Sequence, residues 1–336
     1  MGPVNVASRR SFALVGHAGD GKTSVAEGLL HTAGATRALG RVDDGSSVLD
    51  HWPEEKERRH TLSSHVFGFE HADHVLTLVD TPGDPNFRGE GQICLAALDG
   101  AVLVVSAVDG VKVGTDAMWR AARSQGLPAL AFVNGMDRER ADLDAALASL
   151  AQLEGARPVL VTLPIGAEGG FEGVVDVLRG VALRPAGEGE VPEALRQAAA
   201  AARDHVAEAV AESDDALIEK YLEEGTLSDE EVARGLLAAV RSGQILPVLC
   251  GAAPSLKGIA ALLRAVTEWL PSPAERPQRR ARPPPRPRAP RRGCASACRA
   301  ARARRWSRSG SPSRGARCPR RRGRSRACRR SGPPPS

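Results

Sequence analysis

Eight consecutive residues near the start of the chain constrain its fold more than any other segment. Gly16 through Thr23 fit the pattern G-x-x-x-x-G-K-[ST], and they lie between an apolar run at 12–15 and a helical pattern at 22–30. Glycines in such a loop let the backbone wrap around phosphate groups, and the helix that follows adds its positive dipole end. The segment therefore predicts a phosphate-binding loop; the alternative is a chance glycine-rich turn before a helix.

Two side chains of this loop have specific expected roles. Lys22 would reach the outer phosphates, and the Thr23 hydroxyl would ligate Mg²⁺. The residues expected to surround the phosphates are Gly16, His17, Ala18, Gly19, Asp20, Gly21, Lys22, Thr23 and Ser24.

The first part of the chain alternates apolar runs with helical patterns. Strands are predicted at 12–15, 75–79, 101–106 and 130–133, and helices at 22–30, 88–98 and 115–125. Continuous apolar strands that alternate with helices predict an α/β fold of three layers, in which helices cover both faces of a mostly parallel sheet. The runs at 65–70 and 74–79 are close enough for a hairpin, which would add one antiparallel edge strand.

The pattern changes after a predicted helix at 143–153. Short strands are predicted at 158–164 and 173–177, helices at 192–212, 214–222 and 228–241, a strand at 245–250 and a final helix at 258–270. This order predicts an α+β subdomain inserted at about 158–244, after which the chain returns to the main sheet.

A second motif follows the predicted strand at 75–79. Asp80 ends that strand and begins Asp80-Thr81-Pro82-Gly83. An Asp at the carboxyl end of a strand beside a phosphate loop suits the Mg²⁺ side of the site, and the Gly83 N–H is a candidate sensor of the γ-phosphate. Alone, D-x-x-G is more often a turn, so the argument depends on its place after the phosphate loop.

A third motif, Asn134-Gly135-Met136-Asp137, ends the strand at 130–133. The Asp137 carboxylate can accept hydrogen bonds from guanine N1–H and the exocyclic amine together, whereas adenine presents an acceptor at N1. Asn134 can tie this loop to the phosphate loop. The alternative is a simple loop cap.

Thr61 lies in the polar stretch between the first helix and the hairpin, after Arg58, Arg59 and His60. Its hydroxyl could complete the Mg²⁺ shell when the γ-phosphate is present; the alternative is an exposed basic loop. The remaining histidines, including His65, lack ligand-like spacing and are expected to be solvated.

These motifs, in this order, resemble a translational GTPase of the elongation factor G type, over about 11–273. The likeness includes Gly173-Val174-Val175-Asp176 and Glu219-Lys220-Tyr221-Leu222, and the last guanine-contacting motif of the family matches Cys250-Gly251-Ala252-Ala253. The resemblance implies a P-loop GTPase fold over 8–275, with GTP or GDP and Mg²⁺ as ligands and the ribosome as partner. Nucleotide contacts would include Gly251, Ala252 and Ala253; Mg²⁺ would take Thr23, Thr61 and Asp80.

The same resemblance implies GTP hydrolysis connected with ribosomal translocation or ribosome disassembly. The catalytic positions would be Lys22, Thr61, Gly83 and Asp84. However, the family has His where this chain has Asp84, Lys where it has Gly135, and Ser where it has Ala252. We therefore expect very slow hydrolysis. Two alternatives stay open: a GTP-binding switch without significant hydrolysis, and a truncated, non-functional translation factor fragment.

The charge of the chain is divided unevenly. From Arg276 onward there are 22 Arg residues and no Lys, Asp or Glu, which leaves 24 basic and 40 acidic residues in the rest. Residues 276–336 contain one Trp and no other large apolar side chain, so this Arg/Pro-rich tail is predicted to be disordered. Its origin is open between a frameshift product and an evolved basic tail. A tail that binds nucleic acid would do so through phosphates, blind to sequence, so no specific DNA binding is expected.

No apolar run approaches the ~18 residues of a membrane span, and the first ten residues lack the apolar stretch of a secretory signal. We therefore expect no membrane association and a cytoplasmic, monomeric protein.

Overall fold

The computed structural model describes residues 5–276. These residues belong to one compact unit. The predicted disordered tail, apart from Arg276, lies outside the described residues.

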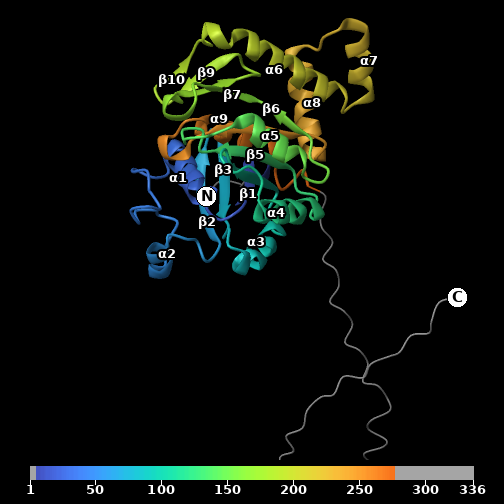
Figure 1. Cartoon of the computed structure of the whole chain (residues 1–336). Coiled ribbons are helices and arrows are strands. Elements are labelled where there is room, and N and C mark those ends of the chain that lie inside the picture. Colours follow the sequence, from blue (N-terminus) through green and yellow to red (C-terminus); the bar gives the residue numbers. More distant parts are fainter. Residues whose placement is uncertain (1–4, 277–336) are drawn as a thin grey trace, which may run out of the picture. The chain divides into compact units, whose positions relative to one another are not determined.

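The main sheet has seven strands in the order β2-β3-β1-β4-β5-β11-β6 (Figure 1). Their bounds are β1 Arg9–Val15, β2 His65–His71, β3 His74–Asp80, β4 Gly100–Ser106, β5 Ala129–Asn134, β6 Pro158–Leu160 and β11 Leu246–Gly251. All neighbours in this sheet pair in parallel except β2 and β3, which form the antiparallel edge hairpin. The predicted α/β class with a mostly parallel sheet is confirmed.

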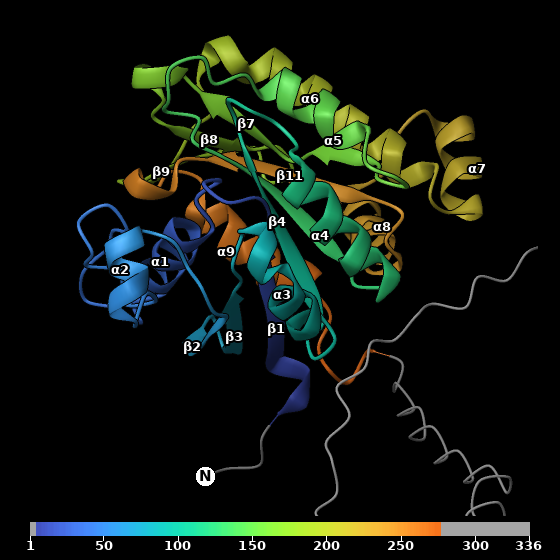
Figure 2. The same ribbon diagram turned by 60° about the horizontal axis from the view of Figure 1, so that its bottom comes forward.

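Helices cover both faces of this sheet. The helix α1 (Lys22–Thr32) packs against α9 (Ile259–Trp269), and α3 (Arg88–Leu95) packs against α4 (Val113–Ser124), as Figure 2 shows. The helix α5 (Leu143–Ala151) lies near β6. Every residue of β4, β5 and β11 is buried, which explains why these strands are continuous apolar runs without alternation.

A second, antiparallel sheet follows β6. Its order is β10-β9-β8-β7, and the bounds are β7 Thr162–Ile165, β8 Gly173–Asp176, β9 Val181–Arg184 and β10 Gly187–Gly189. The helices α6 (Glu193–Ala211), α7 (Asp215–Glu224) and α8 (Asp229–Ser242) come next, and α6 packs against both of the others (Figure 1).

The predicted single strand at 158–164 is therefore two strands in two sheets. Residues of β6 pair with β11, whereas β7 pairs with β8. Between them, Val161 donates its N–H to Val248 and accepts from Val177, so one residue bridges the two sheets.

Short helical segments complete the described chain. One is the α-helix α2 (Pro53–Arg58), and the others are the 3-10 helices η1 Val6–Ser8, η2 Pro85–Phe87, η3 Glu168–Gly170 and η4 Ala253–Ser255. None of the helices within residues 5–276 has the length and apolar character needed to cross a bilayer.

Candidate nucleotide-binding site

The loop between β1 and α1 is shaped by its glycines. Gly19 and Gly21 have φ values of 83° and 85°, a left-handed conformation that side chains disfavour. A Cβ added at Gly16 would overlap the Val104 carbonyl of β4, and one added at Gly21 would overlap the Asn134 amide. The backbone therefore lies closer to its neighbours than any other residue type would permit.

Lys22 opens α1, and its side chain is buried under this loop. Its Nζ donates to the His17 carbonyl at 2.8 Å. Burial lowers the pKa of Lys22, while the nearby carboxylates of Asp80 and Asp20 oppose that shift. Gly83 passes directly over the loop: a Cβ there would lie 2.7 Å from Ala18 N and would overlap Lys22 Nζ. A buried cation between these two backbone segments suits an anionic ligand.

The buried Asp20 carboxylate stabilises the phosphate loop through two contacts. Its Oδ2 accepts the His17 N–H at 3.1 Å, and its Oδ1 pairs with Lys112 Nζ at 3.0 Å. Burial raises the pKa of Asp20, and Lys112 opposes that shift. Sequence reasoning missed Lys112, which comes from the segment after β4 and has no motif around it.

Three oxygen-bearing side chains converge where β3 ends. Thr23 Oγ1 donates to Asp80 Oδ2 at 2.7 Å and lies 3.0 Å from Thr61 Oγ1. Asp80 is fully buried, and its Oδ1 has no hydrogen-bond partner among the described residues. Burial raises the pKa of Asp80 to about 6, although Lys22 opposes this shift. Two hydroxyls and a carboxylate with an unpartnered buried oxygen match the hard oxygen ligands that Mg²⁺ prefers.

Thr61 is held there by a buried polar cluster of Asp50, Glu55 and His65. Thr61 Oγ1 donates to Asp50 Oδ1 at 3.3 Å. Glu55 Oε1 accepts the Leu62 N–H at 2.8 Å and lies 2.9 Å from His65 Nε2. The prediction of a solvated His65 is wrong, because β2 turns that side chain inward.

The spacing of this cluster alone would permit a metal ion. Its ligand atoms lie within 4.8 Å of one another. However, Glu55 Oε1 also accepts from Ser63 N, and Oε2 accepts from Trp52 N. Because both oxygens already bind the chain itself, we interpret the cluster as an anchor for the loop that carries Thr61.

The opposite end of the site joins three loops through one amide. Asn134 Nδ2 donates to the Asp20 carbonyl, and Asn134 Oδ1 accepts the Ala253 N–H, both at 3.0 Å. The Met136 N–H donates to the Gly251 carbonyl at 3.1 Å, and Asp137 Oδ2 accepts from Ser255 Oγ at 3.4 Å. The segments predicted to bind phosphate and guanine are thus adjacent, although 114 residues separate Asn134 from Asp20.

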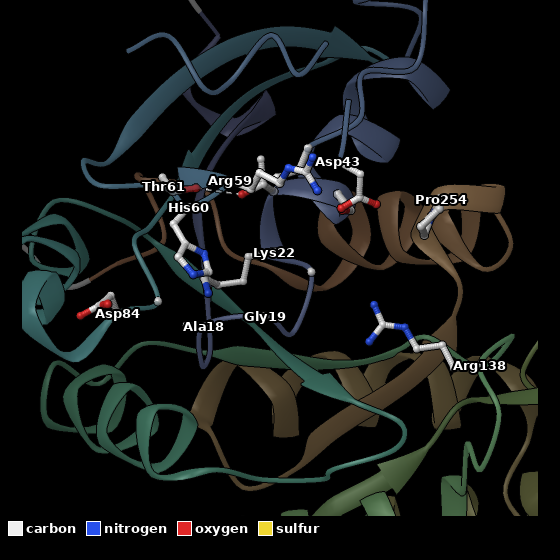
Figure 3. A pocket seen from close by; sticks show the side chains of 15 residues that line it. Ala18, Gly19, Lys22, Asp43, Arg59, His60, Thr61, Asp84, Arg138 and Pro254 are labelled. Atoms are coloured by element: carbon white, nitrogen blue, oxygen red, sulfur yellow. Dashed lines mark hydrogen bonds between the residues drawn. The ribbon is translucent and has the colours of Figure 1, made fainter. Parts of the chain in front are cut away.

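A cavity of about 210 Å³ lies between these loops (Figure 3). Its lining includes predicted residues and several that were not predicted. The predicted ones are Ala18, Gly19, Gly21, Lys22, Thr23, Ser24, Thr61, Gly83 and Asp84, and the others are Val42, Asp43, Arg59, His60, Arg138 and Pro254. The remaining predicted residues do not line the cavity: Gly16, His17, Asp20, Asp80, Asn134, Asp137 and Gly251–Ala253.

Asp84 uses its carboxylate locally. Its Oδ1 accepts the Asn86 N–H at 2.8 Å and so caps η2. In Figure 3 the side chain of His60 extends into the cavity near Lys22, whereas Asp84 lies at its margin. Sequence reasoning considered Asp84 only as a group facing the phosphate and did not identify this cap.

A glycine loop after β1, a buried carboxylate at the end of β3 and an Asn/Asp loop at the end of β5 together define a P-loop GTPase-like fold. The chain belongs to the family described as the elongation factor Tu GTP binding domain, whose model matches residues 7–272.

Its similar proteins include elongation factors G. The chain is 40% identical to Elongation factor G 1 of Geobacter sulfurreducens over 283 residues, which cover 82% of this chain and 41% of that protein. It is 41% identical to Elongation factor G 2 of Streptomyces coelicolor over 274 residues, covering 80% and 40%. A crystal structure from Thermus thermophilus matches with a TM-score of 0.74 and 37% identity, over 80% of this chain and 41% of that one.

These relatives confirm the resemblance to elongation factor G: the chain contains an elongation factor G-like translational GTPase domain. It spans about two fifths of the length of the curated relatives it matches.

Proposed function

We propose that this chain binds GTP and GDP together with Mg²⁺, and that Asp137 selects guanine. The observation that carries the proposal is the double hydrogen bond of Asn134, which ties the phosphate loop to the 251–255 loop. Asp137 comes from the same loop as Asn134 and accepts a hydrogen bond from Ser255 of the 251–255 loop. A carboxylate there accepts from guanine N1–H and the exocyclic amine together, and it repels the N1 lone pair of adenine.

On the other side, Thr23, Thr61 and Asp80 would hold Mg²⁺. The bound metal would neutralise charge on the outer phosphates. Lys22 adds a second positive charge beneath the loop, and the Gly83 N–H lies against the same loop. Thr61 and Gly83 would sense the γ-phosphate, because both line the same cavity as Lys22 without belonging to the phosphate loop.

The proposed reaction is hydrolysis of GTP to GDP and phosphate, at a very low intrinsic rate. Lys22 and backbone N–H groups would stabilise charge on the transferred phosphoryl group. Asp84 adds little to this, because its carboxylate caps η2 and carries charge of the wrong sign for phosphate oxygens. That observation also favours the second candidate function, a GTP-binding switch without significant hydrolysis.

We further propose a monomeric cytoplasmic protein whose partner is the ribosome, with a role in translocation or ribosome disassembly. The support is the family and the elongation factors G that it resembles. Those relatives extend well beyond the matched region, so the proposed ribosomal role rests on the family alone.

Calorimetric titration of the full chain with GTP, GDP, ATP and XTP in the presence of Mg²⁺ tests nucleotide selection. Asp137→Asn should weaken GTP binding on the order of 100-fold, because two charge-assisted hydrogen bonds are lost at roughly 1.5–3 kcal/mol each before partial compensation. It should strengthen XTP binding, since the new amide can donate to the C2 carbonyl of xanthine. Asp144→Asn, on the exposed start of α5, is the matched control. Equal affinity of the unmodified chain for ATP and GTP would contradict the guanine assignment.

A further inference from the structure

The loop after β5 has no side chain at Gly135, where the resemblance described above implies a lysine. Gly135 has a φ of 85°, so the backbone is in the left-handed region. A Cβ added there would lie 3.1 Å from Cδ and 3.2 Å from Nε of Arg138. The space beside Gly135 is therefore already filled by the side chain of Arg138.

A tight turn brings the two residues together. The Arg138 N–H donates to the Gly135 carbonyl at 3.1 Å, which folds the loop back on itself. Arg138 directly follows Asp137, the residue proposed to select guanine. Its side chain lies on the side of the turn where a side chain at position 135 would project.

The guanidinium of Arg138 points into the cavity. Figure 3 shows it extending from the loop toward Gly19 of the phosphate loop, with Pro254 across the opening. Within residues 5–276 its side chain has no hydrogen bond or ion pair. The positive charge of Arg138 helps to lower the pKa of Asp109, but the Asp109 carboxylate already pairs with Lys112 Nζ at 2.7 Å. An arginine that lines a cavity with its donors unused is available to a ligand.

We propose that Arg138 takes the place of the side chain missing at Gly135 and packs its guanidinium against the bound guanine nucleotide. This inference rests on the proposed function. A planar guanidinium stacks on the face of a purine and also attracts an anionic ligand. The contact does not read the base edge, so Arg138 strengthens GTP and GDP binding together and leaves guanine selection to Asp137.

The test measures GDP and GTP affinities of full-chain variants by calorimetry with Mg²⁺. Arg138→Ala should weaken both nucleotides by roughly three- to thirtyfold, the range of a desolvated cation–π contact, with the GTP to ATP preference unchanged. The matched control is Arg140→Ala, because Arg140 is an exposed arginine of the same loop that does not line the cavity. Circular dichroism melting shows whether each variant is folded.

A double-mutant comparison tests whether the two positions share one space. Gly135→Lys alone should gain nothing, because its Cβ would crowd Arg138 and a side chain is strained at a φ of 85°. In the Arg138→Ala background the crowding is gone and only the strain remains, so the same lysine should recover part of the lost affinity. Unchanged affinity in Arg138→Ala, or a loss that Gly135→Lys does not reduce, would overturn the inference. Failure of the unmodified chain to bind GTP would instead overturn the proposed function.

Discussion

At the scale of single residues, Asp80 is the point where a proton and a metal ion would compete. Burial raises its pKa to about 6 from an ordinary value of 3.8. Because the pKa of Asp80 is higher in the folded chain than in the unfolded chain, the ionised carboxylate destabilises the ligand-free fold above pH 6. As the pH falls from 6 toward 3.8, protonation of Asp80 increases the free energy of unfolding. Mg²⁺ needs the carboxylate, so its binding should show the opposite trend.

The apparent Mg²⁺ affinity of the GDP complex should therefore fall about tenfold for each pH unit below the Asp80 pKa, since each metal ion must displace one proton. Mg²⁺ titration at several pH values between 5 and 8, followed by release of a fluorescent GDP analogue, measures this. Asp80→Asn should bind Mg²⁺ weakly with little dependence on pH. A flat profile in the unmodified chain would show that Asp80 is not the metal ligand.

Asp84 permits a second prediction at this scale. Asp84→Asn keeps an acceptor for the Asn86 N–H and removes the charge, whereas Asp84→His introduces the side chain that the resemblance to elongation factor G implies at this position. We expect single-turnover GTP hydrolysis to be very slow in the unmodified chain, little changed in Asp84→Asn and faster in Asp84→His. Nucleotide affinity should stay within about twofold, since the group caps η2 at the cavity margin. Fast hydrolysis by the unmodified chain that Lys22→Ala abolishes would contradict this view of Asp84.

Some residues of the candidate site can be predicted from sequence motifs, whereas others are identified only from the structure. Lys22, Asp80 and Asn134 lie in short patterns next to predicted strand ends, and parallel strands bring those ends to one edge of the sheet. Lys112 has no such pattern around it, and Arg138 follows the Asn134–Asp137 motif without being part of it. The place of Lys112 depends on its tertiary contact with Asp20, and that of Arg138 on the left-handed backbone of Gly135. Local sequence expresses neither.

At the scale of elements, the segment from α2 to β2 depends on one buried carboxylate. Glu55 accepts hydrogen bonds from the backbone at Trp52, Leu62 and Ser63. Burial would raise the pKa of Glu55, but these bonds and the contact with His65 outweigh it and hold the pKa below its usual range. Its stabilising effect is therefore present at neutral pH and is lost as the pH falls through the folded pKa.

Glu55→Ala should release this segment. Arg58 and Arg59 are exposed, so limited trypsin digestion should cut the variant there much faster than the unmodified chain. With Thr61 no longer held against Thr23, Mg²⁺ should add less to GTP affinity while GDP binding changes little. Glu54→Ala, at the exposed neighbouring position, is the control. Equal cleavage of both variants would show that Glu55 does not anchor the segment.

The elements that sequence reasoning missed are short or polar. The helix α2 has six residues with a single buried one, so no hydrophobic periodicity marks it. The strands β9 and β10 have four and three residues, and β10 is wholly exposed. The break between β6 and β7 carries no turn residue, because it arises from pairing with two different sheets. Longer apolar or amphipathic elements such as β4 and α8 were predicted within a few residues.

At the scale of the whole molecule, the class of fold followed from alternation, whereas strand order did not. Periodicity shows that a strand is buried on both faces, but it does not say which strands are its neighbours. The placement of β11 between β5 and β6 depends on a return from an insertion of more than eighty residues, beyond the reach of any local pattern.

Glu275 and Arg276, at the end of the described residues, contact the GTPase domain. Glu275 Oε1 pairs with Arg241 at 2.6 Å, Glu275 Oε2 accepts the Ser272 N–H at 2.7 Å, and Arg276 contacts the Leu98 carbonyl and Asp99. Asp99 precedes β4, at the edge of the sheet opposite the phosphate loop. These contacts therefore stabilise the domain without touching the candidate site.

A chain ending at Gln278 should melt at the same temperature as the full chain and bind GDP equally well. A chain ending at Pro273 loses Glu275 and Arg276, and we expect about 1–2 kcal/mol less stability, because one pair is largely exposed and the other partly buried. For a domain of this size that lowers Tm by roughly 2–8 °C. GDP affinity should stay within about twofold, because the lost contacts lie across the sheet from the nucleotide loops. Glu275→Gln in the full chain isolates the Arg241 contribution. Loss of folding or of GDP binding on truncation at Gln278 would show that residues 279–336 are a structural part of the domain.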